Sequence, residues 1–377
     1  MGPKHIFIAG AGGIGRAAAL LLRELDIIPA EITLGDISES VAQNTREWLL
    51  KDSSVKLPLH AVRMEAGKMT PELEKALKSA DILLDCLPGS EAPRMAQLAR
   101  DFHLHYANLT EYVKETEQVI NIAKDAETGY ILQTGLAPGF VDVLANGMFT
   151  EFCETYRVEQ TESVQMKVGA LTRHANPPHF YGFTWSPVGV ATLYLKPAQV
   201  IRNFQTTVCA SLSERSQLTI DGVVYEEDLT SGGAADLPVA LAGKTRELDY
   251  KTLRYPGHYA WVESLIRDIP RGPGEVELLQ KKMEAAIPLV EDDLVVIYCR
   301  VIGYDREKRL RAIEKSYKIG PVEIGGKRLR AIQATTAAGL VESARILLTG
   351  NLKGVILQSE IPAREFLTGP FVSRIYQ

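Results

Sequence analysis

The sequence predicts an α/β fold with a second α+β domain, and three observations support this. Up to about residue 135 of 377, apolar runs alternate with amphipathic stretches of helical period, which is the pattern of a parallel sheet covered by helices. The chain also begins with an apolar run, a glycine-rich turn and a helical run. From about 158 to 301 the runs become short and alternating, with many turn residues. We therefore expect a doubly wound Rossmann sheet followed by a largely antiparallel sheet.

The opening turn is the most specific motif. It follows an apolar run over residues 4–9 and precedes a helical run that begins near Ala17. The turn matches the dinucleotide fingerprint G-x-G-x-x-G, with Gly10, Gly12, Gly13, Ile14 and Gly15. The first glycine permits the tight turn, the second lets a pyrophosphate approach the backbone, and the third allows close packing of helix on strand. We expect these residues to bind a nicotinamide dinucleotide, with the pyrophosphate at the helix N-terminus.

An acidic residue after the second apolar run bears on the choice of cofactor. The run over residues 31–35 ends at Asp36, about twenty residues after the last glycine of the turn, where a carboxylate binds the adenosine ribose hydroxyls. A carboxylate there repels a 2′-phosphate, and Ile37, Ser38 and Glu39 follow without a cation. The sequence therefore favours NAD over NADP, with Arg46 on the next helix as a residue that could reverse the preference.

The remaining elements of the first half are read from the same alternation. We expect further strands at 57–62, 80–87, 105–108 and 130–134, and helices at 71–77, 91–102 and 116–126. In the later part of the chain, strands are expected around 164–168, 217–220 and 294–301, with a hairpin turn at Asp221-Gly222. A last helix is expected over 337–348.

Ligands in a Rossmann fold bind beyond the carboxyl ends of the strands. Three segments at such ends are expected to face the nicotinamide: 86–89, which contains Leu87 and Pro88; 108–111, which begins with Asn108; and 135–139. Asp142 comes just after the last of these segments, in the first turn of a helix. It is either a helix N-terminal acid or an acceptor for a substrate amine, and the sequence leaves both open.

Two segments of the second domain are dense in polar and aromatic residues, 181–187 and 251–258. The first begins with Tyr181, and the second places Arg254 and His258 on either side of a Pro-Gly turn. An arginine there can bind a carboxylate bidentately, and a histidine can act as a general base at neutral pH. A surface ion pair and a structural histidine are the alternative readings of these two residues.

Composition excludes several classes of function. The net charge of −5 and the lack of a basic cluster argue against nucleic-acid binding. No apolar run approaches the length of a membrane span, and the N-terminus shows no signal peptide. The four cysteines are scattered, and neither they nor the histidines have metal-ligand spacing, so no metal site is expected. A small-molecule substrate and a reduced cytoplasmic location fit this composition.

The chain resembles the saccharopine dehydrogenase family over nearly its whole length. The resemblance is carried by the glycine turn, by the segments 135–140, 181–187 and 251–258, and by the stretch 337–355. It implies NAD(P)-linked redox chemistry at an amino-acid carbon–nitrogen bond. It also implies that the C-terminal helix returns to the Rossmann domain, so that residues 1–137 and 335–377 form the dinucleotide domain and 138–334 an inserted substrate domain. By analogy, that insertion supplies a homodimer interface.

Within the family, the segments 136–139 and 252–258 look most like lysine 6-dehydrogenase, whereas 183–187 looks closer to the glutamate-forming saccharopine reductases. Where those reductases have an Asp-Pro-Gly turn, this chain has Ala137-Pro138-Gly139. The substrate is therefore left open between lysine and a saccharopine-like amino acid. The stretch 271–291 matches nothing in the family.

The resulting hypothesis is an amino-acid dehydrogenase. Its substrate amine must lose a proton before hydride leaves the adjacent carbon, so His258 or Asp142 is expected to act as the base. Arg254 is expected to hold the substrate carboxylate, and Tyr181 to line the substrate site and exclude water. Two alternatives remain: a polyamine enzyme resembling carboxynorspermidine dehydrogenase, and a non-catalytic NAD-binding regulatory protein.

Overall fold

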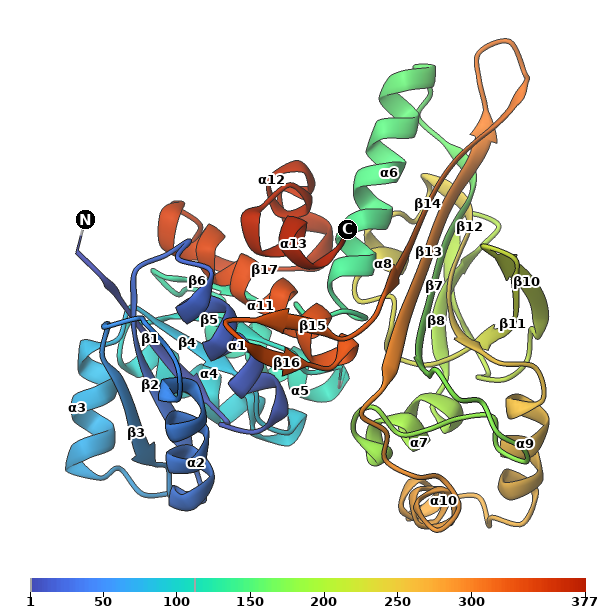
Figure 1. Cartoon of the computed structure of the whole chain (residues 1–377). Coiled ribbons are helices and arrows are strands. Elements are labelled where there is room, and N and C mark those ends of the chain that lie inside the picture. The colour runs from blue at the N-terminus through green and yellow to red at the C-terminus, as the bar shows by residue number, and fades with distance from the viewer. Residues whose placement is uncertain (1, 112) are drawn as a thin grey trace. The chain divides into compact units, whose positions relative to one another are not determined.

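The structure is a computed structural model that describes residues 2–111 and 113–377. The chain divides into two compact units. The first unit contains Met1–Phe140, Val322–Leu329 and Gln333–Gln377, and the second unit contains Val141–Pro321 and Arg330–Ile332. Each unit has its own sheet. The chain thus leaves the first unit after Phe140, forms most of the second and returns at Val322, and it contributes Arg330–Ile332 to the second unit before its C-terminal part (Figure 1).

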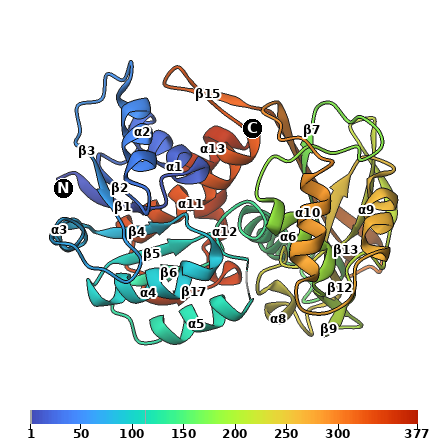
Figure 2. The ribbon, with the colours of Figure 1, turned by 90° about the horizontal axis from the view of Figure 1, so that it is seen from below.

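The first unit is a parallel sheet with helices on both faces (Figure 2). Every pairing in it is parallel, as the sequence predicted. Its strand order is β17 (Gly354–Ile356), β6 (Gly129–Ile131), β5 (His105–Asn108), β4 (Ile82–Asp85), β1 (Lys4–Ala9), β2 (Ala30–Asp36) and β3 (Leu59–Arg63). The order reverses between β1 and β4, and ligands of doubly wound sheets bind at this reversal.

The two faces of this sheet are covered by different helices. One face packs against α3 (Pro71–Ser79), α4 (Ala92–Asp101) and α5 (Val113–Ala123). The other carries α1 (Gly13–Glu24), α2 (Glu39–Leu50) and α11 (Ala331–Thr349) (Figure 2). Since both faces are covered, β1 is apolar from Ile6 to Ala9 after its polar start, and Ile6, Phe7 and Ile8 are fully buried. The short η1 (Gly89–Glu91), η2 (Gln358–Glu360), α12 (Ala363–Leu367) and α13 (Pro370–Ile375) complete the unit.

The C-terminal segment supplies parts of the first unit that the sequence did not reveal. β17 pairs with β6 as a seventh strand, and Gln358 Nε2 donates to the Leu132 carbonyl at 2.6 Å. The hairpin of β15 (Val322–Ile324) and β16 (Lys327–Leu329) also belongs here, because Lys327 Nζ donates to the Lys51 carbonyl at 2.7 Å. The sequence had assigned this hairpin to the substrate domain, and β17 has only three residues to signal a strand.

Several predicted boundaries were wrong by a few residues. The predicted strands 80–87 and 130–134 shorten to β4 and β6, because the residues that follow them turn into loops at the sheet edge. The last helix begins at Ala331 instead of 337, since Asp293 Oδ1 and Oδ2 accept the Ala331 and Ile332 N–H groups and cap it there. Boundaries are set by such tertiary contacts, which a local pattern does not contain.

The second unit is built on a mostly antiparallel sheet, as predicted. Its order is β10 (Ser216–Ile220), β11 (Val223–Leu229), β12 (Thr245–Arg254), β7 (Thr161–Thr172), β13 (Asp293–Tyr304) and β14 (Leu310–Ile319), with β8 (Ala198–Arg202) and β9 (Gln205–Cys209) pairing beside β12. The β12–β7 pair is parallel. The expected hairpin turn joins β10 to β11, and Asp221 and Gly222 both have positive φ there.

Helices of the second unit are α6 (Phe140–Tyr156), α7 (Pro187–Leu195), α8 (Leu237–Ala240), α9 (His258–Arg267) and α10 (Glu275–Glu284). A core of aromatic and aliphatic residues joins α7, α9 and α10, with Tyr181, Tyr194 and Tyr259 among its members. Within the described residues of the chain, no helix is both long and apolar enough to cross a membrane.

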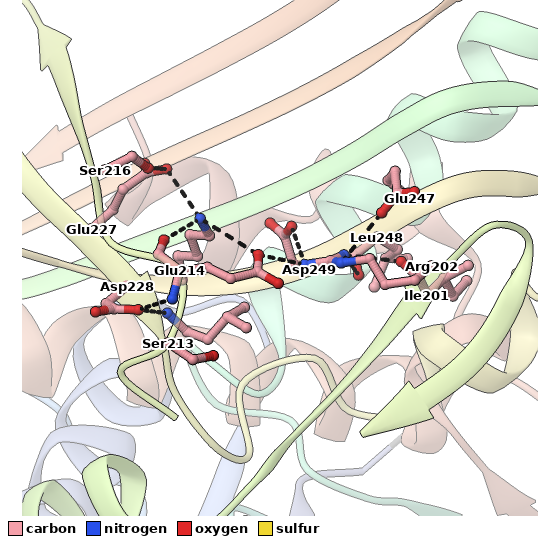
Figure 3. A network of polar contacts seen from close by, with 12 residues as sticks. Ile201, Arg202, Ser213, Glu214, Ser216, Glu227, Asp228, Glu247, Leu248 and Asp249 are labelled. Atoms are coloured by element: carbon pink, nitrogen blue, oxygen red, sulfur yellow. Dashed lines mark hydrogen bonds and ion pairs between the residues drawn. The ribbon is translucent and has the colours of Figure 1, made fainter. Parts of the chain in front are cut away.

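A network of paired charges ties strands of the second unit together (Figure 3). Arg202 on β8 donates to Glu214 Oε2 at 2.7 Å and to Asp249 Oδ2 at 3.2 Å. Lys167 of β7 is nearly buried and pairs with Glu227 of β11. Each of these cations has a carboxylate partner, which is the usual condition for a charge removed from water.

Candidate functional site

The glycine turn of the first unit has the geometry that a dinucleotide requires. A Cβ on Gly15 would lie 1.8 Å from the Gly10 carbonyl oxygen, so the helix can pack this closely only without a side chain. Gly10 has φ +95°, and a Cβ there would meet the Cys86 backbone at 2.9 Å. By contrast, no atom lies within 4 Å of a Cβ on Gly12, which is exposed. Backbone can therefore be approached at Gly12, as the fingerprint demands.

The N-terminus of α1 is open to an anion. Its N-cap residue is Gly12, which offers no side-chain cap, and no acidic residue stands in the first helical turn. The first N–H groups and the positive end of the helix dipole thus keep their capacity for a ligand. Gly13 and Ile14 form the start of this helix, as expected for a pyrophosphate-binding turn.

Asp36 lies against the glycine turn. Its Oδ2 accepts the Ala11 N–H at 2.9 Å, and its Oδ1 accepts the Ser38 N–H at 2.9 Å. These two bonds fix the carboxylate at the end of β2, where each oxygen retains a further lone pair for a ribose hydroxyl. The neighbouring Ile37 is 63% exposed and offers an apolar surface beside it. Arg46 is held elsewhere, since its Nε donates to the Leu59 carbonyl at 2.7 Å.

The ends of β4 and β5 carry a buried polar chain. Tyr106 Oη donates to Asp85 Oδ2 at 2.8 Å, and the Leu87 N–H donates to Asp85 Oδ1 at 3.0 Å. Asn108 Nδ2 donates to Tyr106 Oη at 3.4 Å, while its Oδ1 accepts the Gln133 N–H at 2.8 Å. Burial raises the pKa of Asp85 to about 7.

Asn108 therefore braces β5 against the next loop with its own side chain, while Leu87 and Pro88 remain partly accessible at the edge. Asp85 did not stand out in the sequence, because a single acid inside an apolar run is typical of the end of a buried strand. Its position directly before the Cys86–Pro88 loop was the signal that could have identified it.

At the turn of residues 135–139, stretches of backbone pass very close to one another. A Cβ on Gly139, at φ +133°, would lie 2.3 Å from the Gly135 carbonyl oxygen, and one on Gly339 of α11 would lie 2.6 Å from the same atom. Phe140 N–H donates to that oxygen at 3.0 Å. The glycines at this turn thus serve packing in the first unit.

In the second unit, Arg254 is a buried cation surrounded by tyrosines. It is 1% exposed at the end of β12, and its Nε donates to Tyr194 Oη at 2.7 Å. The guanidinium carbon lies 4.7 Å from the centre of the Tyr181 ring. Among the described residues, no carboxylate oxygen lies within ion-pair distance of it, and its strongest electrostatic neighbours are tyrosines. Such a charge is normally paired or binds an anion.

His258 completes the support of this arginine. A carbonyl can only accept, so the 2.6 Å bond to the His179 oxygen places the proton of the ring on Nδ1. Nε2 then accepts from Tyr194 Oη at 2.9 Å, and Tyr194 in turn accepts from Arg254. Burial and the Arg254 charge lower the pKa of His258 to about 3. The imidazole is fully buried, neutral at pH 7, and engaged at both nitrogens.

The segment 181–187 contributes two buried hydroxyls, and the ring of Tyr181 lies against the arginine. Tyr181 Oη and Thr184 Oγ1 are buried, and neither makes a hydrogen bond of good geometry with the described residues. Burial raises the pKa of Tyr181, and the Arg254 charge opposes that rise. Buried hydroxyls without a well-formed hydrogen bond are uncommon in native proteins, and a bound water or ligand is one explanation for them. Trp185 packs onto Gly189 of α7 and belongs to the surrounding core.

Asp142 lies in the first turn of α6 and is fully buried. Its charge contributes to a raised pKa of the Cys299 thiol on β13 and of Tyr250 on β12. The positive charge of Arg254 opposes this rise in the pKa of Tyr250. The second unit thus brings Arg254, His258 and Tyr181 together. Asp142 and Arg254 both influence the pKa of the same residue, Tyr250.

An open cavity of about 620 Å³ lies beside this cluster, and of the cluster's described residues Tyr194 is the one that lines it. The rest of the lining comes from the 195–212 segment and from residues 263–271, with Glu263, Arg267 and Arg271 as its charged members. Two residues near the arginine were not predicted from the sequence: Thr184, within the aromatic segment 181–187, and Tyr194, on the helix that follows it. No group of histidines, cysteines or acids among the described residues could hold a metal ion.

Comparisons with known proteins decide the family. Residues 6–136 match the model of the saccharopine dehydrogenase NADP binding domain, and residues 135–375 match that of the saccharopine dehydrogenase C-terminal domain. The chain belongs to the saccharopine dehydrogenase family. The family prediction made from the sequence is therefore confirmed, and residues 6–136 are a nicotinamide-dinucleotide-binding domain, with NAD or NADP as its cofactor.

Curated relatives of this saccharopine dehydrogenase family member include the mitochondrial alpha-aminoadipic semialdehyde synthases of Mus musculus and Rattus norvegicus. Each is 27% identical, over 209 and 207 residues respectively, which is 53% of this chain. The match spans only 20% of each relative's length. These relatives are much longer proteins, so their activities are not transferred whole to this chain.

Solved structures show the same fold for this family member. Saccharopine dehydrogenase (L-Glu forming) from Saccharomyces cerevisiae matches with a TM-score of 0.75 at 13% identity, covering 99% of this chain and 98% of its own. Homospermidine synthase from Legionella pneumophila, solved with NAD, matches with a TM-score of 0.64 at 13% identity, covering 99% and 90%. The predicted fold class is thereby confirmed.

Proposed function

We propose that this chain is an NAD(P)-dependent oxidoreductase that removes hydride from an amine-bearing carbon of a small amino acid. Family membership and the glycine turn support the dinucleotide part of the proposal. The single observation that carries the substrate part is Arg254, a fully buried guanidinium without a carboxylate partner among the described residues. A substrate carboxylate would satisfy that charge bidentately.

The residues of the second unit have separate tasks in this proposal. Arg254 binds the carboxylate, and the Tyr181 and Thr184 hydroxyls supply further hydrogen bonds to it. Tyr194, held by His258, fixes the direction of the guanidinium. His258 then acts as a positioning residue instead of the base expected from the sequence, because both of its nitrogens are engaged. Asp142 remains our candidate for the proton acceptor.

The first unit binds and orients the cofactor. Gly12 and the open N-terminus of α1 receive the pyrophosphate, and Asp36 and Ile37 receive the adenosine end. Leu87, Pro88 and Asn108 follow or end β4 and β5, which lie on the other side of β1 from Asp36. In this proposal they face the nicotinamide end of the cofactor. A bound nicotinamide supplies the hydride acceptor. We propose NAD as the preferred cofactor, because Asp36 repels a 2′-phosphate.

A direct assay tests the proposal. Purified protein is incubated with NAD or NADP and with lysine, saccharopine or carboxynorspermidine, and reduced cofactor is followed at neutral and alkaline pH. Turnover of lysine or saccharopine that is lost in Arg254→Met supports it. Turnover of carboxynorspermidine alone would assign the polyamine alternative, to which the homospermidine synthase fold gives structural context. Cofactor binding without any turnover would favour a regulatory protein.

We also propose a cytoplasmic, homodimeric protein, on the basis of its scattered cysteines and of analogy with the family. Light scattering coupled to gel filtration measures the oligomer. A monomer at working concentration would refute the dimer without affecting the proposed chemistry.

A further inference from the structure

A cation stands next to Asp36 that the sequence analysis did not consider. In the parallel pairing of β2 with β3, Asp36 is the register partner of Arg63, and the Met64 N–H donates to the Asp36 carbonyl at 2.8 Å. Register partners in parallel strands project to the same face of a sheet. Arg63 thus shares the face and the carboxyl edge of the carboxylate that is placed to bind the adenosine ribose.

Arg63 is held by one partner. Its Nη1 lies 3.2 Å from Glu65 Oε1, and its side chain is 55% exposed. Glu65 is shared, because Lys68 Nζ lies 2.7 Å from its other oxygen. These two cations lower the pKa of Glu65, with Lys68 contributing more. The pair is exposed to solvent, and exposed ion pairs are easily broken.

The chemistry of the two cofactors differs at this position. NADP carries a 2′-phosphate with close to two negative charges, where NAD carries a hydroxyl. Asp36 accepts hydrogen bonds from the hydroxyl and repels the phosphate. A guanidinium is the preferred side chain for a phosphate, since it donates two parallel hydrogen bonds. Arg46, the cation considered from sequence, is tied to the Leu59 carbonyl.

We propose that Arg63 and Glu65 set the selectivity between NAD and NADP: Glu65 retains the Arg63 guanidinium, so NAD is preferred, and NADP binds when Arg63 transfers from Glu65 to the 2′-phosphate. The inference rests on the proposed function, because it refines the dinucleotide site of the first unit. The chain should therefore bind NADP weakly and not exclude it, because Asp36 repels the 2′-phosphate while Arg63 can attract it.

Equilibrium binding of NAD and NADP to the full chain tests this directly by isothermal titration calorimetry, without turnover. In E65Q, which frees Arg63 and keeps the side-chain size, we expect the Kd for NADP to fall about fivefold, because a competing ion partner is removed. The Kd for NAD should stay within about twofold, since a ribose hydroxyl carries no charge to attract Arg63. In R63Q, NADP should bind about tenfold more weakly, which corresponds to one charge-assisted phosphate contact.

The double variant R63Q/E65Q distinguishes binding of the 2′-phosphate by Arg63 from a general effect of removing the negative charge of Glu65. If Arg63 is the phosphate ligand, the double variant binds NADP as weakly as R63Q, because Glu65 has nothing left to release. An equal gain from E65Q in both backgrounds would overturn the proposal. So would K68Q weakening NADP while R63Q has no effect, because Lys68 would then be the phosphate ligand.

A matched control comes from α3, where Glu74 and Lys78 form a similar exposed pair with 2.6 Å between Oε1 and Nζ. E74Q removes the same charge in a helix and should change neither Kd. Unchanged NADP affinity in E65Q and R63Q, with NAD still bound, refutes this inference alone. Failure of the wild-type chain to bind either cofactor refutes the proposed function with it.

Discussion

The two units offer their candidate ligand groups in opposite ways. In the first unit the ligand-binding surface is mostly backbone: an open helix N-terminus, a bare Gly12 and a carboxylate fixed by two N–H groups. In the second unit it consists of side chains buried in an aromatic core, with Arg254 oriented by Tyr194 and His258. The first kind of site needs glycines at fixed positions, whereas the second needs a folded core.

This difference has an energetic consequence. A backbone site adds little strain to the protein without ligand, because its N–H groups remain near water. A buried guanidinium without a carboxylate partner makes the unliganded second unit less stable than an apolar replacement would. If Arg254 binds a substrate as proposed, the second unit without ligand is less stable than it would be with an apolar residue there, whereas the first unit carries no comparable cost. The predictions below test this contrast, in order of decreasing effect.

The largest effect is expected at Arg254. Arg254→Met should reduce kcat/KM by about a hundredfold or more, because the carboxylate loses a charge-assisted, bidentate contact worth about 3 kcal/mol. The same variant should unfold at an equal or higher temperature than the wild type, since an unpaired buried charge is removed. Activity assays and thermal unfolding by circular dichroism measure the two effects.

Arg202→Met is the matched control for that variant. Arg202 has the carboxylate partners that Arg254 lacks, so its loss should lower stability and leave kcat/KM unchanged. If Arg254→Met were as destabilising as Arg202→Met, Arg254 would be a structural residue, and the contrast between the units would disappear.

The glycine turn gives the next effect. Gly15→Ala should destabilise the first unit by about 1–3 kcal/mol or more, because its methyl group would lie 1.8 Å from the Gly10 oxygen. Gly12→Ala has open space and should leave the unfolding temperature unchanged while weakening cofactor binding about tenfold, through loss of close backbone approach. Equal loss of stability in both variants would contradict the assignment of Gly12 to the pyrophosphate.

The pH dependence of stability should have opposite signs in the two units. His258 has a pKa of about 3 in the folded chain, so the unfolded chain binds more protons below pH 6.5. Its contribution is therefore present at pH 7 and is lost as the pH falls, by about 2 kcal/mol between pH 7 and 5. Asp85, with a pKa raised to about 7, binds its proton more tightly when folded, so its contribution declines as the pH rises from 4 to 7.

These two slopes can be separated with conservative variants. Denaturant unfolding of H258Q should lose less stability than the wild type on going from pH 7 to 5, whereas D85N should lose more. If the free energy of unfolding depends on pH in the same way in the wild type and in both variants, His258 and Asp85 do not have these shifted pKa values.

The smallest effect is expected at Asp36. Asp36→Ala should weaken NAD binding about tenfold, the loss of roughly 1.4 kcal/mol of ribose hydrogen bonding. It should weaken NADP less, since removal of the carboxylate also removes repulsion of the 2′-phosphate. Titration with each cofactor gives the ratio, and an equal loss for both would assign Asp36 only to support of the Ala11 and Ser38 backbone.

The sequence was sufficient for the fold class, and it placed the residues of the proposed dinucleotide site within one βαβ unit. Gly10, Gly12, Gly15 and Asp36 lie where the pattern predicted, because a backbone site is encoded by spacing within one βαβ unit. The seventh strand was missed, since β17 is three residues long and its partner β6 lies more than two hundred residues earlier. A pairing of this kind leaves no local signal.

The second half of the site was only partly predictable. Arg254, His258 and Tyr181 were selected correctly as residues that come together. The bond from Tyr194 to both Arg254 and His258 joins separate parts of the sequence, so the engagement of both imidazole nitrogens could not be read from spacing. Proton positions depend on such long-range partners.

The order in which the chain visits its two units bears on its synthesis. The second unit is almost continuous, from Val141 to Pro321, whereas the first requires residues from both ends of the chain. On the ribosome, the second unit is complete while the Rossmann sheet still lacks α11 and β17. The edge of β6 that β17 covers stays open until the last tenth of the polypeptide has been made, and an open strand edge is prone to pair with other chains.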